Sequence, residues 1–161
     1  MNAASKAPDF LVVIPARLGS TRLPRKPLAD IGGKPMVIRV AERAQQSNAQ
    51  SVVVATDSPE IQAACDEHRI ECLLTSADHP TGTDRIAEVA QLLKLPSNAL
   101  VVNVQGDEPF INKTPLEQIF TAFQNDTDKK IDLASLMFEI KDKTEIENPN
   151  NVKVITDQEG F

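Results

Sequence analysis

Residues 10–27 read FLVVIPARLGSTRLPRKP, a continuous apolar run followed by a basic loop with three prolines. An apolar run without alternation, such as Phe10–Ile14, is typical of a strand that is covered on both faces of a sheet. Runs of the same character recur at 51–56 and 99–104, and a shorter one lies at 71–74. Segments of helical periodicity separate these runs, so the sequence predicts a parallel α/β sheet with right-handed crossovers.

Four helices are expected between and after these strands. Apolar residues spaced for one helical face predict the first at 36–44, and start signals predict others at about 57–68, from about 83, and after 114–115. At the second helix, Asp57 is expected to cap the first turn and Pro59 to occupy it. Two later apolar runs, 133–140 and 151–156, predict a fifth and a sixth strand.

The chain is expected to form one domain over residues 1–161, with residues 1–8 as a disordered tail. Its last residues resemble a hairpin turn with a single arm, which predicts that this domain is incomplete. Its two cysteines, Cys65 and Cys72, lie in apolar surroundings without metal-ligand spacing, which is typical of reduced core thiols in a cytoplasmic protein.

Composition excludes several classes of partner. The net charge of −6 and the pI of about 4.9 argue against nucleic acid or an anionic membrane as the main partner. The chain contains no Trp or Tyr that could stack on bases of a single strand. No apolar stretch approaches the roughly 20 residues of a membrane span.

The positive charge is concentrated in one loop. Residues 11–35 contain five Lys and Arg residues and a single acid, Asp30, inside this acidic chain. Such a loop after a buried strand predicts a site for a small polyanion, with Arg17, Arg22 and Lys26 spaced to hold a triphosphate. The alternative is a solvated charged loop, which the stiffening prolines disfavour. Neither GxxxxGK[ST] nor GxGxxG occurs, so a P-loop or a dinucleotide fold is not supported.

A second polar loop, QGDEP at 105–109, follows the strand at 99–104. In a strand order of 3-2-1-4 this loop and the basic loop lie on opposite lips of one crevice. Asp107 and Glu108 then predict a Mg²⁺ site that uses one or two carboxylates together with substrate phosphates, and Asp107 is the better candidate because it is nearer the strand end. The alternative is a turn that an aspartate caps.

The third polar loop, residues 75–85, leads into a helix. Its hydroxyls, backbone amides and Arg85 could contact the edge of a base, or the loop could be an ordinary helix cap with polar residues at the surface. We expect His79 to be a hydrogen-bonding loop residue rather than an acid or base.

Six ordered blocks of this sequence resemble one known family: 13–27, 31–36, 54–57, 77–85, 102–109 and 148–154. They are similar to the 3-deoxy-manno-octulosonate (Kdo) cytidylyltransferases, also called CMP-Kdo synthetases. The resemblance implies a Rossmann-like three-layer nucleotide-diphospho-sugar transferase fold with a mostly parallel central sheet whose C-terminal part is missing. It also implies that CTP and Kdo react to CMP-Kdo and pyrophosphate for lipopolysaccharide biosynthesis, in a cytoplasmic, Mg²⁺-dependent homodimer.

Roles follow from the resemblance by matching position. Catalytic roles are implied for Arg17, Lys26 and Asp107, with Asp107 as the Mg²⁺ ligand, and Gln105 is implied to contact the sugar. Nucleotide binding is implied for Pro15, Ala16, Arg17, Ser20, Arg22, Lys26, Thr81, Gly82 and Arg85.

Two departures from the family pattern matter. Arg25 stands where members commonly have glycine, which predicts either a solvent-directed side chain or a strained loop. Members also continue beyond residue 161 and are expected to supply a second metal-binding aspartate there. The missing part leaves open an inactive CTP-binding fragment as one alternative. A separate alternative is a cytidylyltransferase for another acidic sugar, such as sialic acid.

Overall fold

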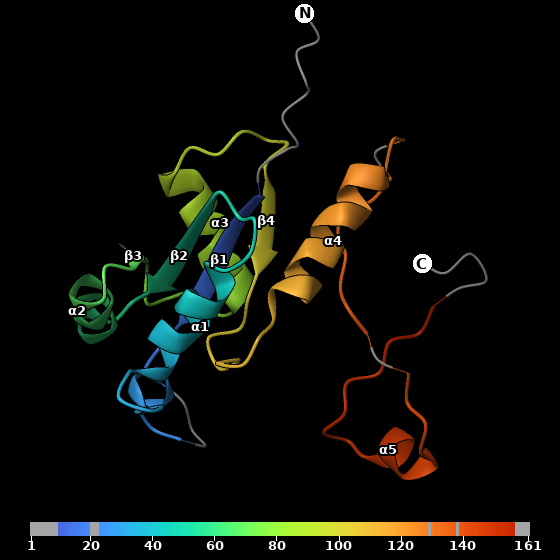
Figure 1. Cartoon of the computed structure of the whole chain (residues 1–161), viewed down its shortest axis with the longest axis horizontal. Coiled ribbons are helices and arrows are strands. Elements are labelled where there is room, and N and C mark those ends of the chain that lie inside the picture. Colours follow the sequence, from blue (N-terminus) through green and yellow to red (C-terminus); the bar gives the residue numbers. More distant parts are fainter. Residues whose placement is uncertain (1–9, 20–22, 129, 138, 157–161) are drawn as a thin grey trace, which may run out of the picture.

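The protein is represented by a computed structural model, which describes residues 10–19, 23–128, 130–137 and 139–156. Four parallel strands form one sheet in the order β3-β2-β1-β4 (Figure 1). Val12 of β1 lies opposite Val52 of β2 on one side and Val102 of β4 on the other. The predicted parallel sheet and strand order are confirmed. The strands are β1 (Phe10–Ala16), β2 (Ser51–Thr56), β3 (Glu71–Leu74) and β4 (Leu100–Asn103).

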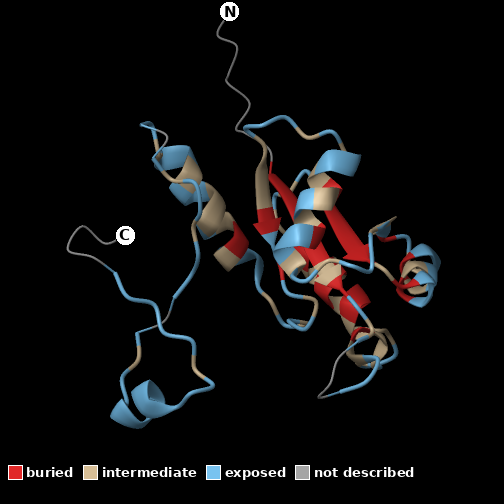
Figure 2. Cartoon of the chain, turned by 180° about the vertical axis from the view of Figure 1, so that it is seen from behind, coloured by how far each residue is buried: buried red, intermediate tan, exposed pale blue. Residues whose placement is uncertain are grey.

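Helices cover both faces of the sheet, which explains why the strands are apolar throughout. Successive side chains alternate between faces, so Val12 and Ile14 join one buried cluster while Leu11 and Val13 join another. The first cluster packs under α1, α2 and α4, and the second packs under α3 (Figure 2). The helices are α1 (Met36–Ala44), α2 (Pro59–Glu67), α3 (Gly82–Leu92) and α4 (Lys113–Asn125).

The start of α2 differs from the prediction. Ser58 is the N-cap and its hydroxyl accepts a hydrogen bond from the Ile61 amide at 3.4 Å, with Pro59 as the first helical residue. The expectation that Asp57 caps this helix is therefore wrong. Ser58 lies one residue nearer than Asp57 to the free backbone amides in the first turn of α2, and its short side chain can reach them. The Asp57 carboxylate therefore remains available for another partner.

The predicted fifth and sixth strands are also wrong within the described residues. Residues 130–137 and 139–156 contain no strand; they contain a short helix, α5 (Lys143–Glu147), which Figure 1 shows apart from the sheet. An apolar run becomes a strand only when a neighbour completes its ladder, and none pairs with these residues here. Large apolar side chains therefore remain exposed along this part of the chain: Leu133, Leu136, Met137, Ile146, Val152, Val154 and Ile155.

Three further sequence-based expectations concern the cysteines, membrane spans and the N-terminal tail. Cys65 is buried, Cys72 is half-buried, and both are free thiols. None of the helices in the described part of the chain is long and apolar enough to cross a membrane. The predicted tail, residues 1–8, lies outside the described residues.

Candidate functional site

A cleft of about 580 Å³ opens at the carboxyl ends of β1 and β4, where the strand order reverses. Eight of the predicted site residues line it: Pro15, Ala16, Arg17, Lys26, Gly82, Arg85, Gln105 and Asp107. Thr81 is adjacent in sequence but is not part of the lining, whereas Ser20 and Arg22 lie outside the described residues. Among the described residues, Gly19, Leu23, Pro27 and Gly106 also line the cleft, and none of them is among the predicted site residues.

The two lips of the cleft meet in an ion pair. Lys26, at the start of a single 3₁₀ turn (η1, Lys26–Leu28), places its Nζ 2.6 Å from Oδ2 of Asp107. The two side chains are 35% and 49% exposed, so solvent or a ligand can compete for both charges. The basic loop and the carboxylate therefore share one cleft, as the strand order predicts.

Gly106 allows this close approach. A Cβ atom at this position would lie 2.9 Å from the carbonyl oxygen of Pro15 and 3.6 Å from Cβ of Ala16. Any side chain would therefore push the loop after β4 away from the end of β1 and would displace Asp107. Gly82 also allows a close approach to the end of β1, although the space is less tight: a Cβ atom added at this position would lie 3.3 Å from Cγ of Pro15.

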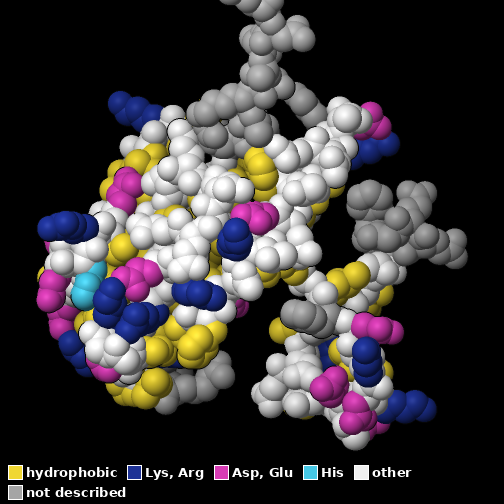
Figure 3. Space-filling model, viewed as in Figure 1, with side chains coloured by type: hydrophobic (Ala, Val, Ile, Leu, Met, Phe, Trp, Pro, Cys, Tyr) yellow, Lys and Arg dark blue, Asp and Glu magenta, His cyan; other side chains and the backbone are white. Residues whose placement is uncertain are grey.

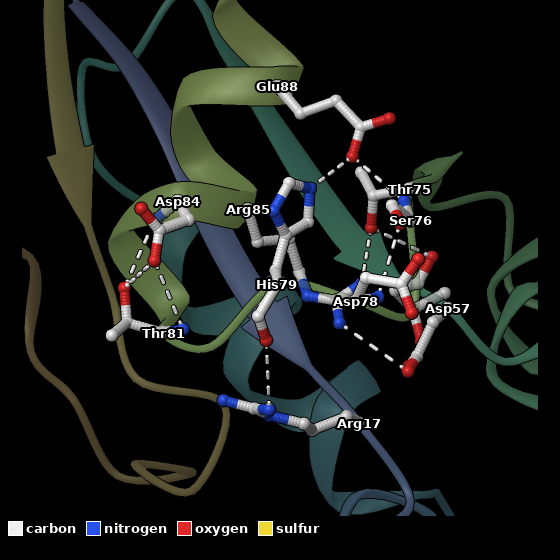
Figure 4. Close-up of polar contacts among 11 residues, drawn as sticks. Arg17, Asp57, Thr75, Ser76, Asp78, His79, Thr81, Asp84, Arg85 and Glu88 are labelled. Atoms are coloured by element: carbon white, nitrogen blue, oxygen red, sulfur yellow. Dashed lines mark hydrogen bonds and ion pairs between the residues drawn. The ribbon is translucent and has the colours of Figure 1, made fainter.

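Arg17 reaches across the cleft from the end of β1 toward the loop before α3 (Figure 4). Its two terminal nitrogens donate to the carbonyl oxygens of His79 and Pro80, both at 3.4 Å. These hydrogen bonds are long and exposed, hence weak. The guanidinium can therefore exchange these carbonyls for a stronger anionic acceptor.

The loop before α3 is held by its own network. Thr81 caps α3 in a capping box with Asp84, which confirms the helix-cap interpretation of this loop. Nε2 of His79 lies 2.5 Å from Oε2 of Glu88, and the Ser76 amide donates to the same oxygen at 2.8 Å. His79 is thus a hydrogen-bonding loop residue, as expected.

These contacts make loop stability depend on pH. The hydrogen bond from His79, followed by that from the Ser76 amide, lowers the pKa of Glu88 from its ordinary value of 4.5. A lowered folded-state pKa means that the stabilisation is complete above pH 4.5 and is lost as the pH falls through the folded-state value. We expect Glu88→Gln to lower the urea midpoint at neutral pH and to have a smaller effect as the solution is acidified. If the difference in urea midpoint between the original chain and Glu88→Gln stays constant with pH, this assignment is wrong.

Arg25 turns away from the cleft. Its backbone is left-handed, with φ of 58°, and its guanidinium holds both carboxylate oxygens of Glu60 on α2, at 3.1 and 2.5 Å. The hydrogen bond to Glu60 raises the pKa of Arg25, and the same bond lowers the pKa of Glu60. The structure thus combines the two predicted outcomes, because a residue in a conformation that favours glycine directs its side chain to the surface.

Replacing Arg25 should therefore be tolerated. In Arg25→Gly the relief of the left-handed backbone opposes the loss of an exposed ion pair. We expect a melting temperature that is unchanged or a few degrees higher, and CTP affinity within about twofold of the original chain. Differential scanning fluorimetry and calorimetry measure both; a loss of CTP affinity of about tenfold or more would show that Arg25 acts in the cleft.

Arg85 lines the cleft although it is only 1% exposed. Its Nη1 donates to the Thr75 hydroxyl, and its Nη2 lies 3.5 Å from Oδ2 of Asp57 (Figure 4). The sequence pattern indicated a capping role for Asp57 instead of a role in the site, because a carboxylate two residues before a helix proline resembles a cap. The position of Asp57 at the end of a buried strand was the only available signal for a site role.

The donors in the cleft are compatible with Mg²⁺. In the described part of the chain no three His, Cys, Asp or Glu side chains form a group that could hold a metal ion by themselves. Mg²⁺ is commonly held by one or two carboxylates plus substrate phosphates, and Asp107 offers an exposed carboxylate beside Lys26 of the basic loop. On the face seen in Figure 1, the space-filling view shows basic and acidic side chains interspersed (Figure 3).

Comparison with known sequences identifies similar proteins, and the matched residues include residues from all four strands of the sheet. The family model described as "Cytidylyltransferase" matches residues 11–161. The 3-deoxy-manno-octulosonate cytidylyltransferase of Polynucleobacter necessarius subsp. necessarius (strain STIR1) is 72% identical over 160 residues, covering 99% of this chain and 62% of the relative. The enzyme of that name from Neisseria gonorrhoeae (strain NCCP11945) is 51% identical over 152 residues, covering 94% and 59%. The chain thus spans about three fifths of the length of these curated relatives.

Comparison with solved structures identifies proteins of the same kind as the sequence comparison does. CMP:2-keto-3-deoxy-manno-octonic acid synthetase complexed with CTP superposes with a TM-score of 0.68 at 41% identity, covering 73% of this chain and 48% of that chain. A cytidylyltransferase from Leptospira borgpetersenii serovar Hardjo-bovis (strain JB197) has a TM-score of 0.62 at 24% identity, covering 74% and 50%. The latter similarity supports the fold alone.

Proposed function

Because the chain belongs to the cytidylyltransferase family, we propose that it binds CTP in this cleft and transfers CMP to Kdo, releasing pyrophosphate. The observation that carries the proposal is the contact between Lys26 and Asp107, which joins a cation and a carboxylate at the cleft where Arg17 also lies. Such an arrangement suits phosphoryl transfer, in which the protein contributes positioning and charge neutralisation.

Arg17 and Lys26 neutralise the triphosphate and the leaving pyrophosphate in this proposal, with Arg22 and Ser20 as further ligands from the same loop. Arg17 gives up two long hydrogen bonds to carbonyl oxygens and gains charge-assisted bonds to phosphate oxygens, which are stronger. At an effective dielectric constant near 20, a charge contact at 4 Å contributes about 4 kcal/mol before desolvation. Two or three such contacts would hold a triphosphate.

Asp107 is the proposed Mg²⁺ ligand. When bound, the ion supplies positive charge to the phosphate oxygens during displacement. Nζ of Lys26 lies 2.6 Å from Oδ2 of Asp107, so a nucleotide phosphate that attracts Lys26 would free the carboxylate for the ion. We infer that the nucleotide and the ion bind with positive coupling for this reason.

The remaining roles concern the base and the sugar. Pro15 and Ala16 offer backbone groups at the end of β1, while Thr81, Gly82 and Arg85 are proposed to contact the nucleoside from the start of α3. Gln105 is proposed to contact Kdo; its amide now donates to Asn103 at 3.4 Å, a contact weak enough to exchange. We further propose that the protein acts in the cytoplasm in lipopolysaccharide biosynthesis and, at the full length of its relatives, as a homodimer.

Two measurements test the proposal. Calorimetry is expected to show saturable CTP binding that strengthens with Mg²⁺, and addition of Kdo is expected to release pyrophosphate. CTP binding without pyrophosphate release would favour an inactive CTP-binding chain, and release with sialic acid but not Kdo would favour the other acidic sugar. Absence of CTP binding would overturn the proposal.

A further inference from the structure

The Asp57–Arg85 pair connects three elements beneath the cleft. Asp57 directly follows β2, Thr75 directly follows β3, and Arg85 lies in the first turn of α3. Thr75 also ties the two strands together, because its amide donates to the Thr56 carbonyl oxygen at 2.9 Å. The position of the guanidinium is therefore set by groups from two strand ends (Figure 4).

The hydrogen bonding of this guanidinium is incomplete. Arginine remains charged in proteins, and a buried guanidinium requires acceptors for its donors. Nη1 has the Thr75 hydroxyl, but buried Nη2 has no hydrogen-bond partner among the residues that the structure describes. Oδ2 of Asp57, at 3.5 Å, supplies the opposite charge without completing a hydrogen bond. Nη2 is shielded from solvent, so Asp57 beside it acts on the orientation of the guanidinium and not on a ligand directly.

We propose that Asp57 is a positioning residue for base recognition, which holds Arg85 in place at the wall of the cleft. The inference rests on the proposed CTP-binding function. Asp57 balances the buried charge from the side of β2, while Thr75 fixes the other terminal nitrogen. The guanidinium is thereby prevented from turning to satisfy its own donors elsewhere in the protein.

Base chemistry explains what this arrangement selects. Cytosine presents two adjacent acceptors, its O2 oxygen and N3 nitrogen, whereas uracil carries a hydrogen on N3. An arginine donor directed at this edge favours the acceptor pair and meets an opposing donor in uracil. Correctly placed hydrogen bonds to a base edge discriminate by about tenfold or more. The positioning role of Asp57 therefore predicts a preference for CTP over UTP.

The test measures CTP and UTP binding by calorimetry in the original chain, Asp57→Asn and Asp57→Glu. Asp57→Asn is expected to reduce the CTP-over-UTP preference by about tenfold. Asp57→Glu keeps the carboxylate and is expected to restore part of it. Asp66→Asn, which removes the same charge from an exposed position on α2, is the matched control and should keep the full preference. A purely structural role would lower stability without changing the ratio, so an unchanged ratio in Asp57→Asn overturns the proposal.

If Asp57→Asn does not fold, a second variant still tests the proposal. The double variant Asp57→Asn with Arg85→Met removes the buried cation together with its counter-ion, and is expected to fold and to bind CTP and UTP equally. A double variant that still prefers CTP overturns the proposal. If the original chain binds CTP and UTP equally, the inference fails while nucleotide binding stands. If it binds neither, the proposed function fails, and this inference fails with it.

Discussion

Arg17→Ala is expected to lower the rate of pyrophosphate release by about 10²- to 10³-fold with CTP, Kdo and Mg²⁺. The guanidinium lies at the cleft and, within the described part of the chain, donates two exposed hydrogen bonds of 3.4 Å. It can therefore follow the charge that develops on the phosphates as pyrophosphate leaves. The fold should persist, because these bonds contribute little to stability. Steady-state kinetics and a thermal melt measure the two effects.

The kinetic constants identify the kind of role that Arg17 plays. A fall in kcat together with kcat/KM indicates an interaction made mainly in the transition state, whereas a rise in KM alone indicates uniform binding of CTP. Arg25→Gly is the matched control, because it removes a guanidinium from the same basic loop that points to Glu60 instead. Equal losses in both variants would mean that the loop acts only through its total charge.

Asp107→Ala is expected to abolish the Mg²⁺ dependence of turnover, with a loss of about 10²-fold or more. The side chain is 49% exposed and contacts Lys26, so its removal opens no core cavity and the melting temperature should change little. The physical reason for the large kinetic effect is the loss of the only carboxylate that lines the cleft in the described part of the chain.

Glu108→Ala is the matched control for Asp107→Ala. Glu108 is the adjacent acid of the same turn, is exposed and does not line the cleft. Its removal should leave the dependence on Mg²⁺ intact. Retention of Mg²⁺-dependent turnover in Asp107→Ala would remove the metal assignment, and a matching loss in Glu108→Ala would transfer part of it to the neighbouring residue.

Much of the fold could be predicted because its determinants are local. The unbroken apolar run at Phe10–Ile14 predicts a strand buried on both faces, and the structure shows that both faces are covered. The capping residues Thr81 and Asp84 lie three positions apart, as the first turn of α3 requires. The cleft was predictable for a different reason, because the order 3-2-1-4 makes the two polar loops neighbours.

The failures have a shared physical cause. The apolar run at 133–140 satisfies the pattern of a strand, yet pairing depends on a partner elsewhere in space, and the described residues 133–137 and 139–140 have none. Asp57 fits the local pattern of a helix cap, yet Ser58 takes that role and Asp57 meets Arg85, which is distant in sequence. A local sequence pattern indicates which structures a residue is able to form. It does not indicate which distant residue will lie beside it in the folded chain.

The sequence by itself therefore determined the strands of the sheet, the helices that cover it, and the placement of cations and carboxylates on loops at one end. Only the tertiary structure decided which charges meet: Lys26 with Asp107, Arg25 with Glu60, and Arg85 with Asp57. Ion pairs and hydrogen bonds act over a few ångströms, whereas Lys26 and Asp107 are 81 residues apart along the chain. Such contacts follow from the packing of the sheet, which no short stretch of sequence encodes.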